Sequence, residues 1–227
     1  MDRSDIGDRM KRYEEANHPL LPRRIPVLIR IDGRAFHTIT RKLYGKGWSA
    51  DFVGVMAETV KLVAKDIQGC NFAYTQSDEA SFLLTDYRTI STNPWFDYDV
   101  QKLVSISASK AASTFTKLTG VEVCFDSRCF SLPQDDVCNY FIWRQIDATR
   151  NAIQMAGREH FSHKQLFQKT CSEIQEMLFQ EKQINFNDYP IHRKRGFCIK
   201  NSEADYEIPI FSKDRDYVEK FAFVRED

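Results

Sequence analysis

The chain has 227 residues, of which 42% are hydrophobic, so it can bury a substantial core in one large or two small domains. Its 32 basic and 32 acidic side chains give a formal net charge of zero, without the overall positive excess typical of nucleic-acid-binding proteins. The charge is uneven, however: residues 201–227 contain eight acidic and four basic side chains, and the other residues therefore carry a net charge of about +4.

The sequence contains no targeting or membrane signal that we recognise. No run of 18 apolar residues is present, and residues 1–5 lack the basic-then-apolar pattern of a signal peptide. The six cysteines include no C-x-x-C pair, which favours reduced thiols. We therefore expect a cytoplasmic protein without a membrane partner.

The first half of the chain predicts a strand, a helix and a hairpin. Residues 27–32 are apolar and β-rich after a proline, and Asp32-Gly33 ends this strand in a turn. A helix is predicted over 51–67, followed by strands over 71–76 and 80–84. The inward positions of that helix are expected to be Phe52, Met56, Val60, Val63 and Ile67.

A second helix over 100–118 and a fourth strand over 121–131 complete the pattern. The inward helix positions are expected to be Val104, Ala108, Ala111, Phe115 and Leu118. The order β-α-β-β-α-β predicts an α+β fold of the ferredoxin-like type. Two helices, 135–157 and 163–179, and a short β-rich tail, 196–211, follow. The second opens with a capping box at Ser162.

Two aspartates occupy positions at which chemistry is expected. Asp32 ends the first strand, and Asp78 lies in the hairpin between the second and third strands. The first and third strands are central neighbours in this topology, so the two carboxylates can converge and hold two magnesium ions. The alternative is that both are turn aspartates that accept local backbone hydrogen bonds. Glu79 can bind a metal ion or face solvent.

Phosphate and RNA contacts have weaker signals. Backbone N–H groups after Gly33 can cradle a triphosphate, although no Walker A motif is present. His37 can contact a base or be a core histidine, and Lys102 can meet phosphates or simply face solvent. Arg193-Lys194-Arg195 is one of several basic clusters that either touch RNA or form a solvated face.

Three motifs together resemble the tRNA-His guanylyltransferase family. They are Arg30-Ile31-Asp32-Gly33-Arg34-Ala35-Phe36-His37, then Tyr74-Thr75-Gln76-Ser77-Asp78-Glu79-Ala80-Ser81-Phe82, and Trp143-Arg144-Gln145-Ile146-Asp147. The resemblance extends from about residue 5 to 200, and the motifs are in the right order with suitable spacing.

The resemblance implies a polymerase-palm catalytic core over 1–134, with a helical and β-rich extension over 135–227 packed on it as one globular unit. It also implies a homotetramer, a dimer of dimers, that uses two Mg²⁺ ions, tRNA, and GTP, ATP or other nucleoside triphosphates. The catalytic residues would be Asp32, Asp78 and Glu79, and the metal would be bound by Asp32, the Gly33 carbonyl and Asp78. The nucleotide contacts would come from Asp32, Gly33, Arg34, Ala35, Phe36, His37, Lys46, Ser77, Asp78 and Lys102. The hypothetical tRNA contacts are Arg30, Arg150, Asn151, Arg193, Lys194 and Arg195.

One departure from the family pattern concerns the choice of tRNA. Members that act on histidine tRNA carry His-Ile-Asn-Asn after the third motif, whereas this chain has Thr149-Arg150-Asn151-Ala152. The chain therefore resembles the branch of like-proteins that repair 5′-truncated tRNAs by template-dependent 3′-5′ addition after activation with ATP or GTP. The alternatives are a guanylyltransferase specific for histidine tRNA, a palm-fold nucleotidyl cyclase, and a tRNA-binding module without catalysis. The cyclase is disfavoured because no Gly-Gly hairpin stands at residues 77–79.

Overall fold

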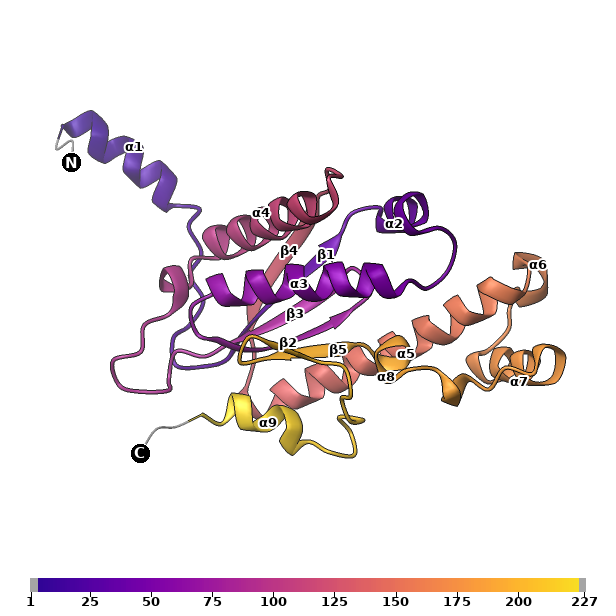
Figure 1. Ribbon diagram of the computed structural model, residues 1–227. Helices are drawn as coiled ribbons and strands as arrows, with labels where there is room; N and C mark the ends of the chain where they lie inside the picture. Colours follow the sequence, from indigo (N-terminus) through magenta and orange to yellow (C-terminus); the bar gives the residue numbers. More distant parts are fainter. Residues whose placement is uncertain (1–3, 225–227) are drawn as a thin grey trace.

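The computed structural model describes residues 4–224 and contains a six-stranded antiparallel sheet with the strand order β4-β1-β3-β2-β5-β6 (Figure 1). The strands are β1 (Val27–Gly33), β2 (Cys70–Gln76), β3 (Glu79–Leu84), β4 (Phe125–Ser131), β5 (Phe197–Lys200) and β6 (Glu203–Asp205). Because β1 pairs with both β3 and β4, the predicted ferredoxin-like arrangement with central first and third strands is confirmed.

Helices cover both faces of this sheet. They are α1 (Asp5–Glu15), α2 (Phe36–Tyr44), α3 (Ala50–Asp66), α4 (Val100–Thr119), α5 (Val137–His160), α6 (His163–Leu166), α7 (Cys171–Lys182), α8 (Ile191–Arg195) and α9 (Asp216–Ala222). Helices α3 and α4 lie on one face, whereas α5 and α9 lie on the other (Figure 1). Within residues 4–224, no helix has both the length and the apolar character needed to cross a membrane.

The α3/α4 face of the sheet is apolar. Alternate side chains of β1, Val27, Ile29 and Ile31, are fully buried against Met56 of α3 and Phe115 of α4. Each buried side chain of this size contributes roughly 1.5–3 kcal/mol of transfer free energy. This layer therefore provides most of the rigidity of the central strand.

The opposite face joins the two halves of the sequence. Leu28 of β1 and Phe72 of β2 share a core with Phe141 of α5 and Val218 of α9. Strand β5 also pairs with β2, with Ala73 opposite Ile199. The segment after residue 134 thus contributes both strands and core to the sheet formed by the first half.

The predicted inward face of the second helix is wrong at two positions. Leu118 is 43% exposed and Val104 is only partly buried, whereas Leu103 and Ser107 are fully buried. The Ser107 hydroxyl hydrogen-bonds the Leu103 carbonyl at 2.6 Å and the Ser127 hydroxyl of β4 at 2.8 Å. A polar residue with satisfied hydrogen bonds can occupy the inward face, which an apolar periodicity cannot reveal.

Element boundaries differ elsewhere as well. The predicted strand over 121–131 begins only at Phe125, and the predicted helix over 163–179 is two helices. The capping box of Ser162 and Gln165 is confirmed, but a second box, of Thr170 and Glu173, starts α7. Helix α2 was not predicted: it begins after the left-handed residue Ala35 and has no side-chain cap to mark it in the sequence.

Candidate active site

Asp32 lies at the end of the central strand, on the sheet face that α5 covers. Its register partners are Glu79 on β3 and Asp126 on β4. Three acidic residues therefore sit side by side across three neighbouring strands. Like charges directly opposite one another destabilise a sheet unless a cation compensates them.

Asp78 reaches the same place from the β2–β3 hairpin. Ser77 adopts the left-handed conformation, with φ of 54°, which turns the chain sharply. Its hydroxyl donates a hydrogen bond to Asp78 Oδ1 at 2.9 Å. Asp32, Asp78 and Glu79 line one cavity of about 380 Å³. Asp32 and Asp78 therefore converge on one cavity, as the sequence predicts.

The electrostatics of these carboxylates favour a bound cation. Burial raises the pKa of Asp78 to about 6, and Asp32 adds to this rise. Burial and the facing Asp126 also raise the pKa of Asp32. A carboxylate whose negative charge is disfavoured by burial and by a second carboxylate gains stability when a cation binds between them.

The donor set fits magnesium rather than a closed all-protein metal cage. In the part of the chain that the structure describes, no cluster of three or more His, Cys, Asp or Glu side chains is arranged to hold an ion by itself. Two carboxylates and a backbone carbonyl leave positions for water and substrate phosphates, as Mg²⁺ requires. A side chain at Gly33 would place its Cβ 2.3 Å from the Phe36 ring, so this backbone stays bare beside the carboxylates.

Glu79 is engaged by Arg144 of α5. The guanidinium donates Nε and Nη2 to the two Glu79 oxygens, both at 2.7 Å. Arg144 also reaches Asp147 at 3.2 Å, and Arg30 lies 3.9 Å from Glu79. Glu79 therefore neither faces solvent nor stands free for a metal ion, and its expected catalytic role remains a prediction.

A second cavity, of about 480 Å³, adjoins the first and shares Ser77 and Asp78 with it. Its size suits a nucleotide. The lining of this second cavity combines aromatic and aliphatic side chains with cationic ones. The lining includes Gly33, Ala35, Phe36, His37, Tyr44, Lys46, Trp48, Phe52, Arg41, Arg158, Arg193 and Phe197.

Glu159 holds one wall of this second cavity in place, and no motif in the sequence pointed to it. Glu159 Oε1 accepts the backbone N–H of Trp48 at 2.8 Å, and Oε2 accepts Arg193 Nη2 at 2.7 Å. Gly47, at φ of +96°, lies so close that a Cβ there would be 2.9 Å from the Glu159 carboxylate. The loop that carries Lys46 is thereby tied to α5 and α8.

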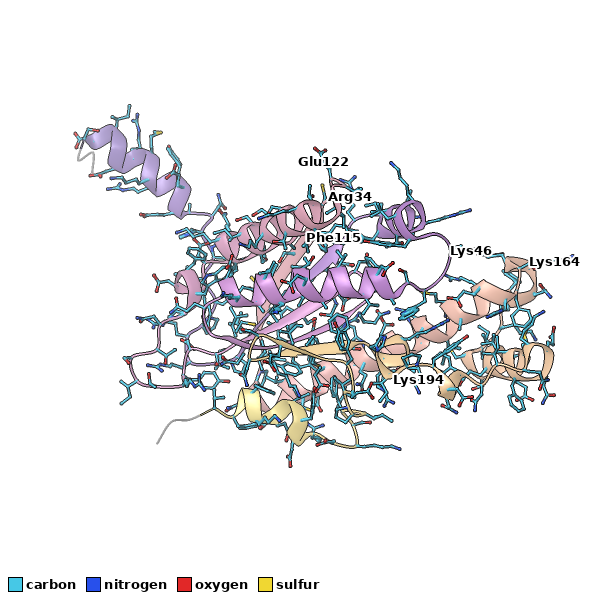
Figure 2. All side chains as sticks on the ribbon, in the orientation of Figure 1. Arg34, Lys46, Phe115, Glu122, Lys164 and Lys194 are labelled. Carbon is cyan, nitrogen blue, oxygen red and sulfur yellow. The ribbon has the colours of Figure 1, made fainter. Side chains whose placement is uncertain are left out.

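Two predicted nucleotide contacts lie elsewhere in this chain. The Arg34 side chain lines a groove beside α4 with Glu122, as Figure 2 shows, while its backbone N–H donates to Cys124 at 2.9 Å. Lys102 lies at the start of α4, 3.8 Å from Asp99, and lines neither cavity. Helix α4 places its C-terminal end, not this lysine, beside the end of β1.

The predicted tRNA contacts are dispersed. Arg150 and Asn151 both hydrogen-bond Asp147, at 2.8 Å and 3.4 Å, at the edge of the cavity that Asp32 and Asp78 line. Arg193 stacks on Tyr189 with 3.7 Å to the ring centroid, and the Arg195 carbonyl accepts the Tyr74 hydroxyl at 2.7 Å. The Lys194 ammonium donates to the Asn187 carbonyl. The side chains of Arg193 and Lys194 are thus held by contacts within the chain, whereas Arg195 makes its contact through its backbone.

Residues on β4 complete the site and were missed from the sequence. Arg128 stands directly opposite Arg30, just as Asp126 stands opposite Asp32. The sheet face thus carries a pair of cations next to a pair of anions. The alternation of charged residues at 126 and 128 was visible in the sequence, but the register that places them beside β1 was not.

Comparisons with known proteins agree with this fold. The model of the family "tRNAHis guanylyltransferase" matches residues 7–133. A bacterial tRNA-His guanylyltransferase-like protein solved with ATP is 44% identical, with a TM-score of 0.93 over 97% of this chain and 100% of that one. One solved with GTP is 41% identical, with a TM-score of 0.87 over the same shares.

A curated relative extends the comparison to eukaryotes. The probable tRNA-His guanylyltransferase of Dictyostelium discoideum is 28% identical over 211 residues, which cover 84% of this chain and 80% of that protein. The three motifs that carry the resemblance lie within the structure as two convergent aspartates and the arginine that binds Glu79. The chain belongs to the tRNA-His guanylyltransferase family, whose members are nucleotidyltransferases that act on tRNA.

Proposed function

We propose that this protein adds nucleotides to the 5′ end of truncated tRNA, in the 3′-5′ direction and under the direction of the opposite strand, after activation with ATP or GTP. The observation that carries the proposal is the pair Asp32 and Asp78 in a cavity that shares lining residues with a second one of nucleotide size. The bacterial relatives solved with ATP and with GTP support both nucleotides as substrates.

The first chemical step activates the RNA. A 5′-monophosphate oxygen attacks the α-phosphorus of ATP or GTP, and the bond to the β-phosphate oxygen breaks as pyrophosphate leaves. The product is a 5′-5′ pyrophosphate-linked end. Such a transfer requires positioning and charge neutralisation more than a protein nucleophile, so no side chain need form a covalent bond.

The second step joins the incoming nucleotide. Its 3′-hydroxyl attacks the 5′ phosphorus of the activated RNA, the hydroxyl proton is lost, and the nucleoside monophosphate introduced in the first step leaves. The new 5′ end then carries the triphosphate of the added nucleotide. An RNA that already has a 5′-triphosphate skips the first step and releases pyrophosphate in the second.

The chain's own residues bind and orient the reactants. Asp32, Asp78 and the Gly33 carbonyl would hold Mg²⁺, which supplies charge stabilisation of phosphoryl oxygens when bound. Cations such as Lys46 and Arg158 line the nucleotide cavity and neutralise phosphates there. Tyr44, Trp48 and Phe52 offer the apolar wall against which a base can lie.

The replacement of His-Ile-Asn-Asn favours repair of several tRNAs over selection of histidine tRNA. Within that stretch, Arg150 and Asn151 are both held by Asp147 beside the metal cavity. By the same resemblance we expect a cytoplasmic homotetramer built on a core of 1–134 and an extension of 135–227. The unburied apolar face of α1, with Ile6 60% and Tyr13 68% exposed, supports contact between subunits.

The decisive test is the direction of growth. A tRNA lacking its first nucleotide is incubated with Mg²⁺ and all four nucleoside triphosphates, and product length and added base are read out. A 3′-deoxynucleotide should bind without being joined, because the attacking oxygen is missing, whereas periodate oxidation of the tRNA 3′ end should have no effect. Joining of the 3′-deoxynucleotide, or loss of addition after periodate treatment, would refute the proposal. Guanine added to histidine tRNA alone, whatever the template base, would favour the histidine-specific enzyme.

A further inference from the structure

A large aromatic side chain lies exposed beside the catalytic carboxylates. Trp143 of α5 is 53% exposed, whereas Trp95, for which stacking on a base would otherwise be considered, is buried in the α3/α4 core. The next residue along the same face of α5, Ile146, is also 63% exposed. An exposed indole is unusual enough to require an explanation beyond packing.

The indole ring is held in place from one side. The Arg144 guanidinium lies 4.5 Å from the ring centroid, and the Tyr140 ring lies 5.8 Å away in an edge-on arrangement. Arg144 is itself fixed by its two 2.7 Å hydrogen bonds to Glu79. Because little conformational freedom remains to be lost, the open part of the ring can bind a planar ligand at low entropic cost.

The same contacts place the ring next to the reaction site. Glu79 is the register partner of Asp32, so one arginine side chain connects the Trp143 ring to the metal-binding strand. Tyr140 packs on Phe130 of β4 at 5.6 Å, which puts Trp143 on the β4 side of α5. It therefore lies outside the nucleotide cavity, which Trp143 does not line.

The charges around the ring fit a polyanion. On β4, Arg128 is exposed and stands opposite Arg30, and its guanidinium lies 3.2 Å from Asp126. Arg150 is exposed two turns of α5 beyond the indole and lies 2.8 Å from Asp147. Exposed guanidiniums that can exchange these carboxylates for phosphates, beside a rigid aromatic ring, are the combination that binds a nucleic-acid backbone and stacks its bases.

We infer that Trp143 is a stacking platform for the terminal base pair of the RNA acceptor stem. This inference rests on the proposed function and adds to it the surface that holds the RNA end. The ring caps the last base pair, so that the 5′ phosphate of that pair meets Asp32 and Asp78 while Arg128 and Arg150 hold the strand backbone. Loss of one stacked base weakens RNA binding by about tenfold.

The test uses the fluorescence of a base analogue. An acceptor-stem minihelix that lacks its first nucleotide carries 2-aminopurine as its 5′-terminal base, paired with uracil, and a dye at the far end of the stem. Dye anisotropy reports binding, and 2-aminopurine fluorescence reports stacking. The full chain is compared with Trp143→Phe, Trp143→Leu and Trp143→Ala. Ile146→Ala is the matched control, because it removes an exposed apolar side chain from the same helix face.

At saturating protein, we expect 2-aminopurine fluorescence to be quenched by the wild type, by Trp143→Phe and by Ile146→Ala. It should not be quenched by Trp143→Leu or Trp143→Ala, and these two variants should bind the minihelix about tenfold more weakly. Quenching retained in the Leu and Ala variants overturns the inference. The inference is also overturned if the wild type extends the minihelix without quenching 2-aminopurine fluorescence. A Trp143→Ala variant that changes oligomeric state but still quenches the fluorescence would instead make the ring a subunit contact and would likewise overturn it. A wild type that neither binds nor extends the minihelix refutes the proposed function itself.

Discussion

The two faces of strand β1 differ although they are made by alternate residues of one seven-residue strand. Toward α3 and α4 the strand presents Val27, Ile29 and Ile31, all fully buried. Toward α5 it presents Leu28, then Arg30, then Asp32, and only the first belongs to a core cluster. The first face is apolar to its end, whereas the second changes from apolar to charged within three positions.

This difference shows how one strand can stabilise the fold and carry chemistry together. The apolar face fixes the backbone, and the charged face holds a pair of carboxylates beside a pair of guanidiniums, so that each like-charged pair is partly offset by its neighbours. Asp32–Asp126 and Arg30–Arg128 are both like-charged pairs in register. Such pairs reduce stability and are therefore expected where a ligand compensates them.

The largest expected effect is on activity, and it distinguishes Asp32 on the charged face of β1 from its neighbour Ile31 on the apolar face. Asp32→Asn should lower nucleotide addition by about 1000-fold with little loss of stability, because it removes a proposed metal ligand without changing the volume of the side chain. Ile31→Ala should instead lower the free energy of unfolding by about 2–5 kcal/mol, because it leaves a cavity in the α3/α4 core. Product formation per folded molecule and urea denaturation measure the two effects. An Asp32→Asn variant with full activity would contradict the metal assignment.

The next effect is on stability and concerns the ion pair between Arg144 and Glu79. Arg144→Ala should destabilise the fold by about 3–5 kcal/mol, because it removes both short hydrogen bonds to the buried Glu79 carboxylate and leaves only Arg30, 3.9 Å away, to meet its charge. The double variant Arg144→Ala/Glu79→Ala should recover part of that loss. A double-mutant cycle by urea denaturation measures the coupling between the two side chains. Strictly additive losses would show that the pair contributes no coupling.

A smaller effect depends on pH. The pKa of Asp78 is about 6 in the folded protein against an ordinary 3.8. The free energy of unfolding therefore falls as pH rises from about 4 to 6, and the full cost of burying the ionised carboxylate is present above pH 6. In chelator at pH 8, Asp78→Asn should therefore raise the free energy of unfolding by about 1–3 kcal/mol. The gain should fade as pH falls through 6 toward 4, where wild-type Asp78 is neutral in the folded state too.

Added Mg²⁺ provides the control for that measurement. It should stabilise the wild type at pH 8 and have little effect on Asp78→Asn, because the variant lacks the charged ligand. A gain for Asp78→Asn that is equally large at pH 4 and pH 8 would count against a buried, ionised carboxylate.

The smallest effect concerns the loop that carries Lys46. Glu159→Gln removes the charge that Arg193 meets at 2.7 Å but keeps the size of the side chain. We expect the KM for the activating nucleotide to rise about fivefold with little change in kcat, because the cavity wall becomes looser. Glu181→Gln, at an exposed position of α7, is the matched control. Equal KM values for both variants would assign Glu159 no role in holding the nucleotide.

Periodicity and turn chemistry predicted the sheet well because they are local. The apolar run before Asp32 and the break at residues 77–79 gave β1, β2 and β3 with almost their observed bounds. The same reasoning predicted the inward face of α4 wrongly because it does not expect a polar residue there. Ser107 is buried on that face because its hydroxyl hydrogen-bonds Ser127, which lies 20 residues further along the chain. Helix α2 and the division of α6 from α7 depend on capping that a propensity pattern does not reveal.

The sequence by itself predicted the order of the four core strands and of the two helices between them, and it singled out two aspartates, because strand patterns and short motifs are properties of neighbouring residues. The tertiary structure decided what stands around those aspartates. Strand register brought Asp126 and Arg128 beside β1, and helix packing brought Arg144 onto Glu79 and Glu159 onto the loop of Lys46. It also placed Lys102 outside both cavities. These contacts join residues far apart in the chain, and their formation depends on the packing of the whole sheet rather than on any local pattern.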